Sequence, residues 1–396
     1  MTRQAASPES RISVKGLLPE ELEILLAKEG APRYAAGQVF SWLYAKKAES
    51  FDKMTDLNRE LRAKLVSGYA RKDAALVGEQ VGTDGTRKLL VRMHDGERVE
   101  SVIIPDEKRS TLCLSSQSGC ARGCAFCATA TMGLHRNLTA GEIVEQALIA
   151  SRIAPVTNAV FMGMGEPLDN YEAVSRAVRI LTSQKGFGLG ARHVTVSTSG
   201  VVPGILRMAA ERLPAGLTVS LTAPDDELRS TLVPINRTWP IAKVMEACKK
   251  WADTMERDVT LAYVLMAGIN DSPKHAMALA KLARKASAKV NLIPCNPARG
   301  FQPPPDSRVY EFQTELKASG VLALYRRSRG GDIAAACGQL VVSGGRKATH
   351  ASAISEETSA PPPPISGKSP ALTAGKSATK RRDLDRSTVG KRKTRA

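Results

Sequence analysis

The spacing of apolar residues divides the chain into regions of different kinds. Between residues 13 and 75 they recur at helical spacing, which predicts helices at Leu17–Lys28, Ala36–Lys46 and Asn58–Ala70. Within residues 76–108, two apolar runs flank an Asp-Gly turn. This pattern predicts a β-hairpin with strands Lys88–Met93 and Arg98–Pro105, which would connect the helical region to the rest of the chain.

Between residues 109 and 345, short apolar runs alternate with amphipathic segments. The predicted strands are Thr111–Ser116, Ala159–Gly163, His193–Thr198, Leu217–Thr222, Val259–Leu265, Lys289–Ile293 and Val321–Arg327. The predicted helices are Ala140–Ile153, Tyr171–Ser183, Pro203–Arg212, Ile241–Met255, Pro273–Lys285 and Val309–Ser319. This alternation favours the α/β class, with a parallel sheet closed into a partial (β/α)6 barrel. In such barrels the chemistry gathers at the C-terminal ends of the strands.

The two ends of the chain lack apolar periodicity. Residues 346–396 pass through four consecutive prolines into a Ser-, Ala- and Lys-rich sequence with 12 Lys and Arg against 4 Asp and Glu, which predicts a disordered basic tail. Residues 1–12 are also expected to be disordered, and they lack the apolar core of a secretory signal. No run of 18 apolar residues occurs, so we expect no membrane span and a cytoplasmic protein.

The charge of the chain indicates an anionic partner. There are 57 Lys and Arg against 39 Asp and Glu in 396 residues, a formal net charge of +18. The tail carries +8 of this, which leaves +10 on the remainder. Nucleic acid is the simplest anionic partner, although charge alone does not distinguish RNA from DNA or from an acidic membrane surface. Aromatic residues make up only 4%, which argues against a surface that mainly stacks bases.

Three of the seven cysteines crowd into one loop. Cys120, Cys124 and Cys127 follow a predicted strand with C-x3-C-x2-C spacing. A structural zinc site is the alternative, but it normally needs four Cys or His ligands, and no second pair stands at a suitable spacing. Three thiolates suit a [4Fe-4S] cluster with one iron free to bind S-adenosylmethionine (SAM), which the cluster can cleave to a deoxyadenosyl radical. The odd number of cysteines also argues against a secreted disulfide scaffold.

Small and polar residues follow the other predicted strands. Each of these short sequences alone is typical of a loop, but together at successive strand ends they predict a rim that binds SAM. The rim residues are Gly165, Glu166, Ser197, Ser220, Leu221, Thr222 and Asn296. Glu166 could hold the ammonium group of the methionine moiety. Cys248 and Cys295 are expected to be inert small apolar residues.

Seven stretches carry a more specific resemblance. They are Thr111–Cys127, Asn137–Thr139, Phe161–Leu168, Val194–Pro203, Leu228–Pro240, Asn291–Pro297 and Asp332–Leu340. With them, the chain resembles the RlmN/Cfr family of radical SAM adenosine methyltransferases over about residues 13–345, and is most similar to the RlmN type. The resemblance implies methylation of adenine C2 in 23S rRNA and tRNA, with RNA bound by the helical N-terminal domain. Thr222, Ala262 and Gly331 depart from it, standing where His, Glu and Asp are expected.

The family resemblance also assigns roles to three further residues. Cys337 would accept a methyl group from one SAM, and a radical made from a second SAM would activate that methyl for addition to C2. Glu100 would accept the C2 proton. Cys113 would then release the product by forming a transient disulfide with Cys337. From the sequence pattern alone, Glu100 would be an ordinary solvated strand residue.

Several alternatives remain open at this point. Methylation at C8, as in Cfr-type relatives, is one; the sequence Gly165–Leu168 favours C2 by analogy. A radical SAM enzyme for a small molecule or protein is another, but it would not need the Cys113–Cys337 pair or the basic excess. A zinc-dependent RNA-binding protein is the third. We also expect a monomer that takes electrons from a donor such as flavodoxin or ferredoxin.

Overall fold

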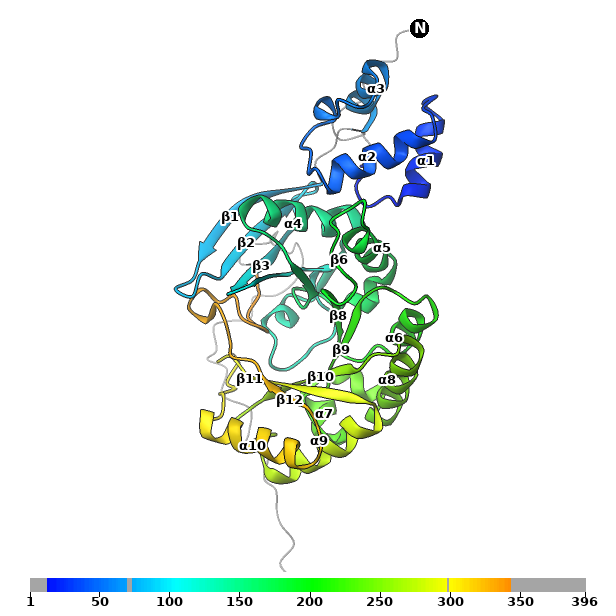
Figure 1. Cartoon of the computed structure of the whole chain (residues 1–396). Coiled ribbons are helices and arrows are strands. Elements are labelled where there is room, and N and C mark those ends of the chain that lie inside the picture. The colour runs from blue at the N-terminus through cyan, green and yellow to red at the C-terminus, as the bar shows by residue number, and fades with distance from the viewer. Residues whose placement is uncertain (1–12, 70–72, 298, 343–396) are drawn as a thin grey trace, which may run out of the picture. The chain divides into compact units, whose positions relative to one another are not determined.

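The strands of the barrel form one continuous sheet. The structure is a computed structural model, and it describes residues 13–69, 73–297 and 299–342. Within these residues the main sheet has ten strands in the order β1-β2-β3-β4-β7-β8-β9-β10-β11-β12 (Figure 1). The pairs from β4 to β12 are all parallel. The parallel sheet predicted from the sequence is therefore confirmed.

Six strand–helix units build the barrel, as predicted. A seventh parallel strand, which pairs with the sixth, follows the last helix. The parallel strands are β4 (Arg109–Cys113), β7 (Asn158–Phe161), β8 (Val194–Thr198), β9 (Gly216–Ser220), β10 (Val259–Leu265), β11 (Ala288–Pro294) and β12 (Ala323–Tyr325). The helices between them are α4 (Ala140–Ile153), α5 (Tyr171–Thr182), α6 (Val202–Ala210), α8 (Ile241–Met255), α9 (Pro273–Lys285) and α10 (Asp306–Ala318). An additional short helix, α7 (Asp226–Leu232), precedes α8 and was not predicted.

Amphipathic patterning explains why the helices cover the strands. In α8, Val244, Cys248 and Trp251 recur every three or four residues and are fully buried. Lys249 and Lys250 lie on the opposite face and are exposed. Figure 1 shows α6, α8, α9 and α10 around the outside of the strands. Among the described residues, no helix is both long and apolar enough to cross a membrane.

The predicted hairpin contains one more strand than expected. β1 (Ala74–Val81), β2 (Arg87–Met93) and β3 (Arg98–Asp106) pair antiparallel, and β3 also pairs with β4, so they extend the barrel sheet. The predicted helical region therefore ends before Ala74 rather than at residue 75. The sequence pattern missed β1 because this edge strand exposes most of its residues, which removes the alternation that marks a half-buried strand.

The three predicted N-terminal helices are confirmed. They are α1 (Pro19–Ala27), α2 (Tyr34–Tyr44) and α3 (Arg59–Tyr69), with a 3-10 turn, η2 (Phe51–Lys53), before the last. The side-chain oxygen of Asn58 caps α3 by accepting a 2.7 Å hydrogen bond from the Leu61 amide. Ala70, the predicted last residue of α3, lies outside the described residues, as do the predicted disordered segments 1–12 and 346–396.

Candidate active site

The three-cysteine loop is held at its base by a small hairpin. β5 (Gln117–Gly119) and β6 (Leu134–Asn137) pair antiparallel on either side of it. Gly119 has a φ of +75°, and a Cβ there would lie 1.9 Å from the Gly133 carbonyl oxygen. Only glycine permits this approach, which lets the Cys120 amide donate a 2.7 Å hydrogen bond to the Gly133 carbonyl. The loop that carries the cysteines is therefore closed by backbone contacts.

A cavity joins this loop to the C-terminal ends of the strands, where most of the predicted rim residues lie. All three loop cysteines line it, and Cys337 contributes from the C-terminal segment. The predicted rim residues that line it are Gly165, Glu166, Ser197, Ser220 and Asn296. Leu221 and Thr222 do not line it; they are fully buried behind Ser220. We call this space the cluster cavity.

The spacing of the three thiols argues against a single metal ion. Zinc–sulfur bonds of about 2.3 Å in a tetrahedron place the ligand sulfurs about 3.8 Å apart. In the part of the chain that the structure describes, only His94, Asp95 and Glu142 bring three potential ligand atoms within 4.8 Å of one another. The three loop sulfurs therefore do not all lie within 4.8 Å of one another, and an iron–sulfur cluster accepts each cysteine on a different iron.

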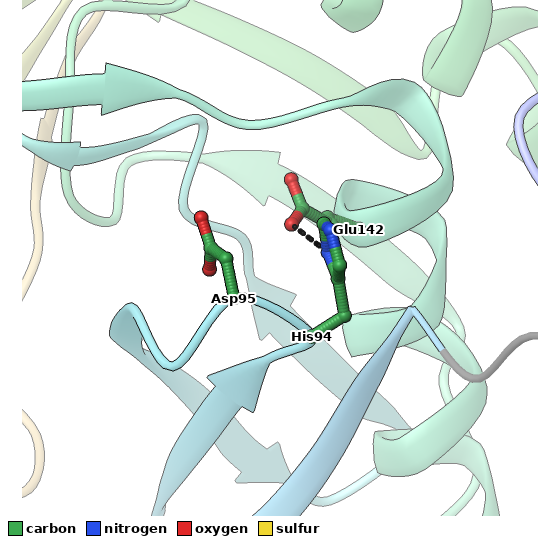
Figure 2. Close-up of side chains that lie close together, drawn as sticks. All are labelled: His94, Asp95 and Glu142. Atoms are coloured by element: carbon green, nitrogen blue, oxygen red, sulfur yellow. Dashed lines mark ion pairs between the residues drawn. The ribbon is translucent and has the colours of Figure 1, made fainter. Parts of the chain in front are cut away.

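The His94, Asp95 and Glu142 group is an ion-pair network (Figure 2). His94 Nδ1 lies 3.6 Å from a carboxylate oxygen of Glu142. The Arg136 guanidinium, however, lies 2.7 Å from a carboxylate oxygen of Asp95 and 2.8 Å from one of Glu142. This guanidinium bonds to oxygens of both carboxylates that a metal ion would need, so a metal ion would have to displace it.

Glu166 is the most constrained residue of the rim. Its carboxylate is buried and accepts 2.8 Å hydrogen bonds from both the amide and the hydroxyl of Ser199. The Leu168 amide donates a further bond of 3.0 Å. Burial raises the pKa of Glu166, while these donors lower it. The acid is thus fixed at the wall of the cluster cavity by three donors from its own chain.

Sequence reasoning missed Arg229, whose hydrogen bonds connect the C-terminal ends of β8 and β9. This arginine on α7 is fully buried, and burial lowers its pKa to about 10. Its guanidinium donates to the Ser199 carbonyl at 2.6 Å, to the Ser220 carbonyl at 3.2 Å and to the Leu221 carbonyl at 3.0 Å. Arg229 therefore fixes the backbone behind the rim. Its residue type usually indicates a solvated surface, so no pattern in the sequence marks it.

A second cavity brings Cys113 and Cys337 together across more than 220 residues of sequence. Both thiols line it, and both are free in this structure. Cys113 is buried on β4, whereas Cys337 is exposed on the loop after η6 (Gly331–Ile333). Cys337 also borders the cluster cavity, so it is the cysteine that stands between the two spaces. We call the second space the thiol cavity.

Backbone contacts attach the Cys337 segment to the cysteine loop. The Ala128 amide donates to the Gly338 carbonyl at 2.7 Å, and the Thr129 hydroxyl donates to the Leu340 carbonyl at 2.7 Å. From β11, the Asn296 side-chain amide donates to the Cys337 carbonyl at 2.9 Å. The cysteine loop, a strand end and the C-terminal segment therefore position Cys337 jointly.

Glu100 lies next to this segment but lines neither cavity. It is buried on β3, where Lys88 Nζ lies 3.2 Å from one carboxylate oxygen and the Val341 amide donates to the other at 3.0 Å. Burial raises the pKa of Glu100, and the positive charge of Lys88 opposes this rise. The interpretation of Glu100 as a solvated strand residue is therefore wrong.

The three departures from the family pattern occupy different environments. Thr222 is buried with a φ of +62°, a strained conformation for a β-branched residue, and its hydroxyl has no partner among the described residues. Ala262, on β10, lines the cluster cavity. Gly331 begins η6, and a Cβ there would meet nothing within 4 Å.

Two family models match the chain. Residues 12–69 match the ribosomal RNA large subunit methyltransferase N-terminal domain, and residues 114–280 match the radical SAM superfamily. The first match covers the three N-terminal helices. The second covers the cysteine loop and most of the rim.

Curated proteins and a crystal structure are similar over most of the chain. The dual-specificity RNA methyltransferase RlmN of Anaeromyxobacter sp. (strain Fw109-5) is 47% identical over 350 residues, which covers 85% of this chain and 93% of that protein. A probable RlmN from Moorella thermoacetica is 45% identical over 84% of this chain and 97% of its own length. A radical SAM methyltransferase from Sphaerobacter thermophilus is 47% identical with a TM-score of 0.79, covering 83% and 99% of the two chains.

Proposed function

Because this chain belongs to the RlmN family of radical SAM RNA methyltransferases, we propose that it methylates C2 of adenosine in 23S rRNA and in tRNA. Family membership also implies a [4Fe-4S] cluster and SAM as cofactors. The observation that carries the proposal is the place of Cys337 between the cluster cavity and the thiol cavity. A thiol in that place can exchange a group with SAM on one side and with Cys113 on the other.

In this proposal, the chain's own residues bind and orient the cofactors. Cys120, Cys124 and Cys127 hold the cluster, which, when bound, supplies the electron that cleaves SAM. The rim of Gly165, Glu166, Ser197, Ser220 and Asn296 holds SAM, and Leu221 and Thr222 support that rim from behind. Glu166 accepts three hydrogen bonds in this structure, and its position at the wall suits the methionine ammonium.

Cys337 and Cys113 divide the methyl transfer between them. Adenine C2 is an electron-poor carbon without an acidic hydrogen, so it cannot displace the methyl of SAM directly. The Cys337 thiolate takes that methyl by displacement, and two SAM molecules are consumed in each turnover. After the methylene carbon has bonded to C2, the adduct must lose the C2 proton and one unpaired electron to restore the aromatic ring, and that electron would pass to the bound cluster. Cys113 then attacks the Cys337 sulfur. An S–S bond forms, the S–CH2 bond breaks, and its electron pair and a proton complete the methyl group on the base.

Glu100 is proposed as the acceptor of the C2 proton. Its burial raises its pKa and so makes it a stronger base than an exposed glutamate. One of its oxygens accepts a hydrogen bond from the Val341 amide. For this oxygen to accept the C2 proton, the segment around Val341 must move away when RNA binds. Release of this oxygen would couple proton acceptance to entry of the substrate.

The remaining partners follow from the same proposal. Basic residues, including those of the N-terminal helices, would hold the RNA through its phosphates. Such contacts position the RNA but do not read its sequence. The target adenosine must leave its stack to reach the barrel mouth. We propose that the enzyme is a cytoplasmic monomer and takes electrons from a flavodoxin or ferredoxin.

Nucleoside mass spectrometry tests the product. The reconstituted enzyme is incubated with a 23S rRNA fragment, or with tRNA, and with SAM labelled in its methyl group. We expect labelled 2-methyladenosine from both RNAs and none from the Cys337→Ala variant. Labelled 8-methyladenosine would assign the Cfr-type reaction instead, and an unlabelled RNA would contradict an RNA substrate. Metal analysis of the same sample must give about four irons per chain, since a single zinc contradicts the cofactor.

A further inference from the structure

Among the described residues that line the thiol cavity, Arg326 is a half-buried cation without an ion pair. The walls of the cavity are largely apolar, formed by Ile104, Val160, Met162, Ile293 and Leu340 around the two thiols. Its remaining polar side chains come from the run between Arg326 and Arg329, and no carboxylate lines it. A positive charge in such an environment interacts strongly with any anion that forms beside it.

The three arginines of this run differ in their partners. Arg329 donates to the Pro105 carbonyl at 2.7 Å and lies 3.7 Å from Asp84. Arg327 is exposed and bonds to the Tyr310 hydroxyl at 3.4 Å. Arg326 is half-buried, and within the described part of the chain its guanidinium forms no ion pair. It contacts the sulfur of Met162 instead, at 3.8 Å.

Cys113 needs such a cation more than an exposed thiol would. Burial raises its pKa to about 12, and a negative charge on Cys337 would raise it further. The positive charge of Arg326 and a hydrogen bond from the Met162 backbone oppose this rise. Thiolate, not thiol, is the nucleophile, and a positive charge nearby favours the thiolate.

We propose that Arg326 is a positioning residue that stabilises the thiolate of Cys113 for its attack on Cys337. This inference rests on the resolving role proposed for Cys113. The Cys113 proton leaves to solvent, the thiolate forms the S–S bond, and the S–CH2 electron pair departs toward the base. Arg326 balances the negative charge before the attack and takes part in no bond change.

Modification of Cys113 without RNA and without SAM tests the inference directly. The holoenzyme carries Cys337→Ser, so that Cys113 is the only thiol of the cavity, and methyl methanethiosulfonate is the probe. Peptide mass spectrometry follows each cysteine between pH 7 and 9. Removal of the charge in Arg326→Gln should raise the thiol pKa by about one unit, which lowers the thiolate fraction about tenfold. The more basic thiolate is a better nucleophile, so the measured rate should fall about three- to fourfold.

Two matched variants and an internal control separate charge from structure. Arg326→Lys keeps the charge and should recover most of the rate, whereas Arg327→Gln removes the neighbouring charge and should leave the rate unchanged. Cys248, fully buried on α8, must stay unmodified, because its labelling would report an opened fold. Equal Cys113 rates in Arg326→Gln and Arg327→Gln, or a Cys113 as unreactive as Cys248 in every variant, would overturn the inference.

A second measurement distinguishes thiolate stabilisation from a phosphate contact. With RNA and SAM, the Arg326→Gln enzyme should accumulate a covalent RNA–protein adduct while its RNA affinity stays unchanged. Weaker RNA binding with normal Cys113 reactivity would instead make Arg326 a phosphate ligand and would contradict the inference. The proposed function can fail separately: if the wild-type protein forms no methylated RNA, the modification rates still decide whether Arg326 acts on Cys113.

Discussion

The cluster cavity and the thiol cavity share Cys337 but are built in different ways. The cluster cavity is made by one loop and by the ends of consecutive parallel strands, which the fold brings to one side of the barrel. The thiol cavity is made by strands β3, β4, β7 and β11 and by residues 326–340, which follow the last barrel strand. The first follows from barrel geometry, whereas the second requires the C-terminal segment to fold back over the barrel.

In the proposed mechanism, the radical is generated in the cluster cavity, and the covalent sulfur intermediate is resolved in the thiol cavity. In this mechanism, the residues of the cluster cavity hold the cluster and SAM without any contribution from Cys113. The thiol cavity adds the buried thiol of Cys113 and the half-buried guanidinium of Arg326, which the proposed reaction through a covalent sulfur intermediate would use. Damage to the thiol cavity should therefore leave cofactor binding intact.

Loss of Cys337 gives the largest effect that this comparison predicts. Cys337→Ala should abolish RNA methylation, at least a thousandfold by the usual cost of removing a covalent nucleophile. Its cluster absorbance and iron content should match the wild type, because Cys120, Cys124 and Cys127 remain. Cys124→Ser should lose both activity and cluster. Substantial methylation by Cys337→Ala would rule out the methyl-carrier role. Cys248→Ala is the control for loss of a thiol elsewhere in the barrel.

Loss of Cys113 should stop the reaction at a later step. In Cys113→Ala, the methylene carbon can bond to adenine, but nothing cleaves the sulfur–carbon bond. RNA should therefore remain covalently attached to Cys337, as a band shifted in a denaturing gel that disappears after nuclease digestion. If this variant gives only free and unmodified RNA, Cys113 acts before adduct formation and is not the resolving residue.

The two cavities also differ in how far the sequence could predict them. The C-x3-C-x2-C spacing and the polar residues after each strand predicted a cofactor site at the strand ends, where the cluster cavity lies, because parallel strands end on the same edge. No local pattern relates Cys113 to Cys337 or places Arg326 beside them, since their proximity depends on how the C-terminal segment packs. Family resemblance supplied the two cysteines. It did not supply Arg229 or Arg326, whose structural roles depend on burial that the sequence does not reveal.

The Lys88–Glu100 pair should contribute to stability in a pH-dependent way. Lys88→Met leaves the buried Glu100 carboxylate unpaired, which should lower the free energy of unfolding by about 3 kcal/mol at pH 8. Burial raises the folded-state pKa of Glu100, so the cost of burying its charge is absent when the group is protonated and appears as pH rises. The variant should therefore lose less stability at pH 5 than at pH 8 in denaturant titrations.

The neighbouring residue on β2 provides the control for this measurement. Arg87 pairs with Glu79, and both side chains are about one-third exposed (39% and 31%). Arg87→Met should therefore cost at most about 1 kcal/mol, with little dependence on pH. Equal losses for Lys88→Met and Arg87→Met at both pH values would show that the buried pair is not a source of pH-dependent stability.

The basic tail (residues 346–396) gives the smallest predicted effect. Among the described residues, those that line the two cavities extend no further than Leu340, so removal of the tail should leave cluster content and turnover on saturating RNA unchanged. Its net charge of +8 should still contribute to phosphate binding. We expect weaker RNA binding at low salt and a shallower dependence of log affinity on log salt. A salt titration that superimposes on that of the full chain would show that residues 1–345 alone carry the RNA affinity.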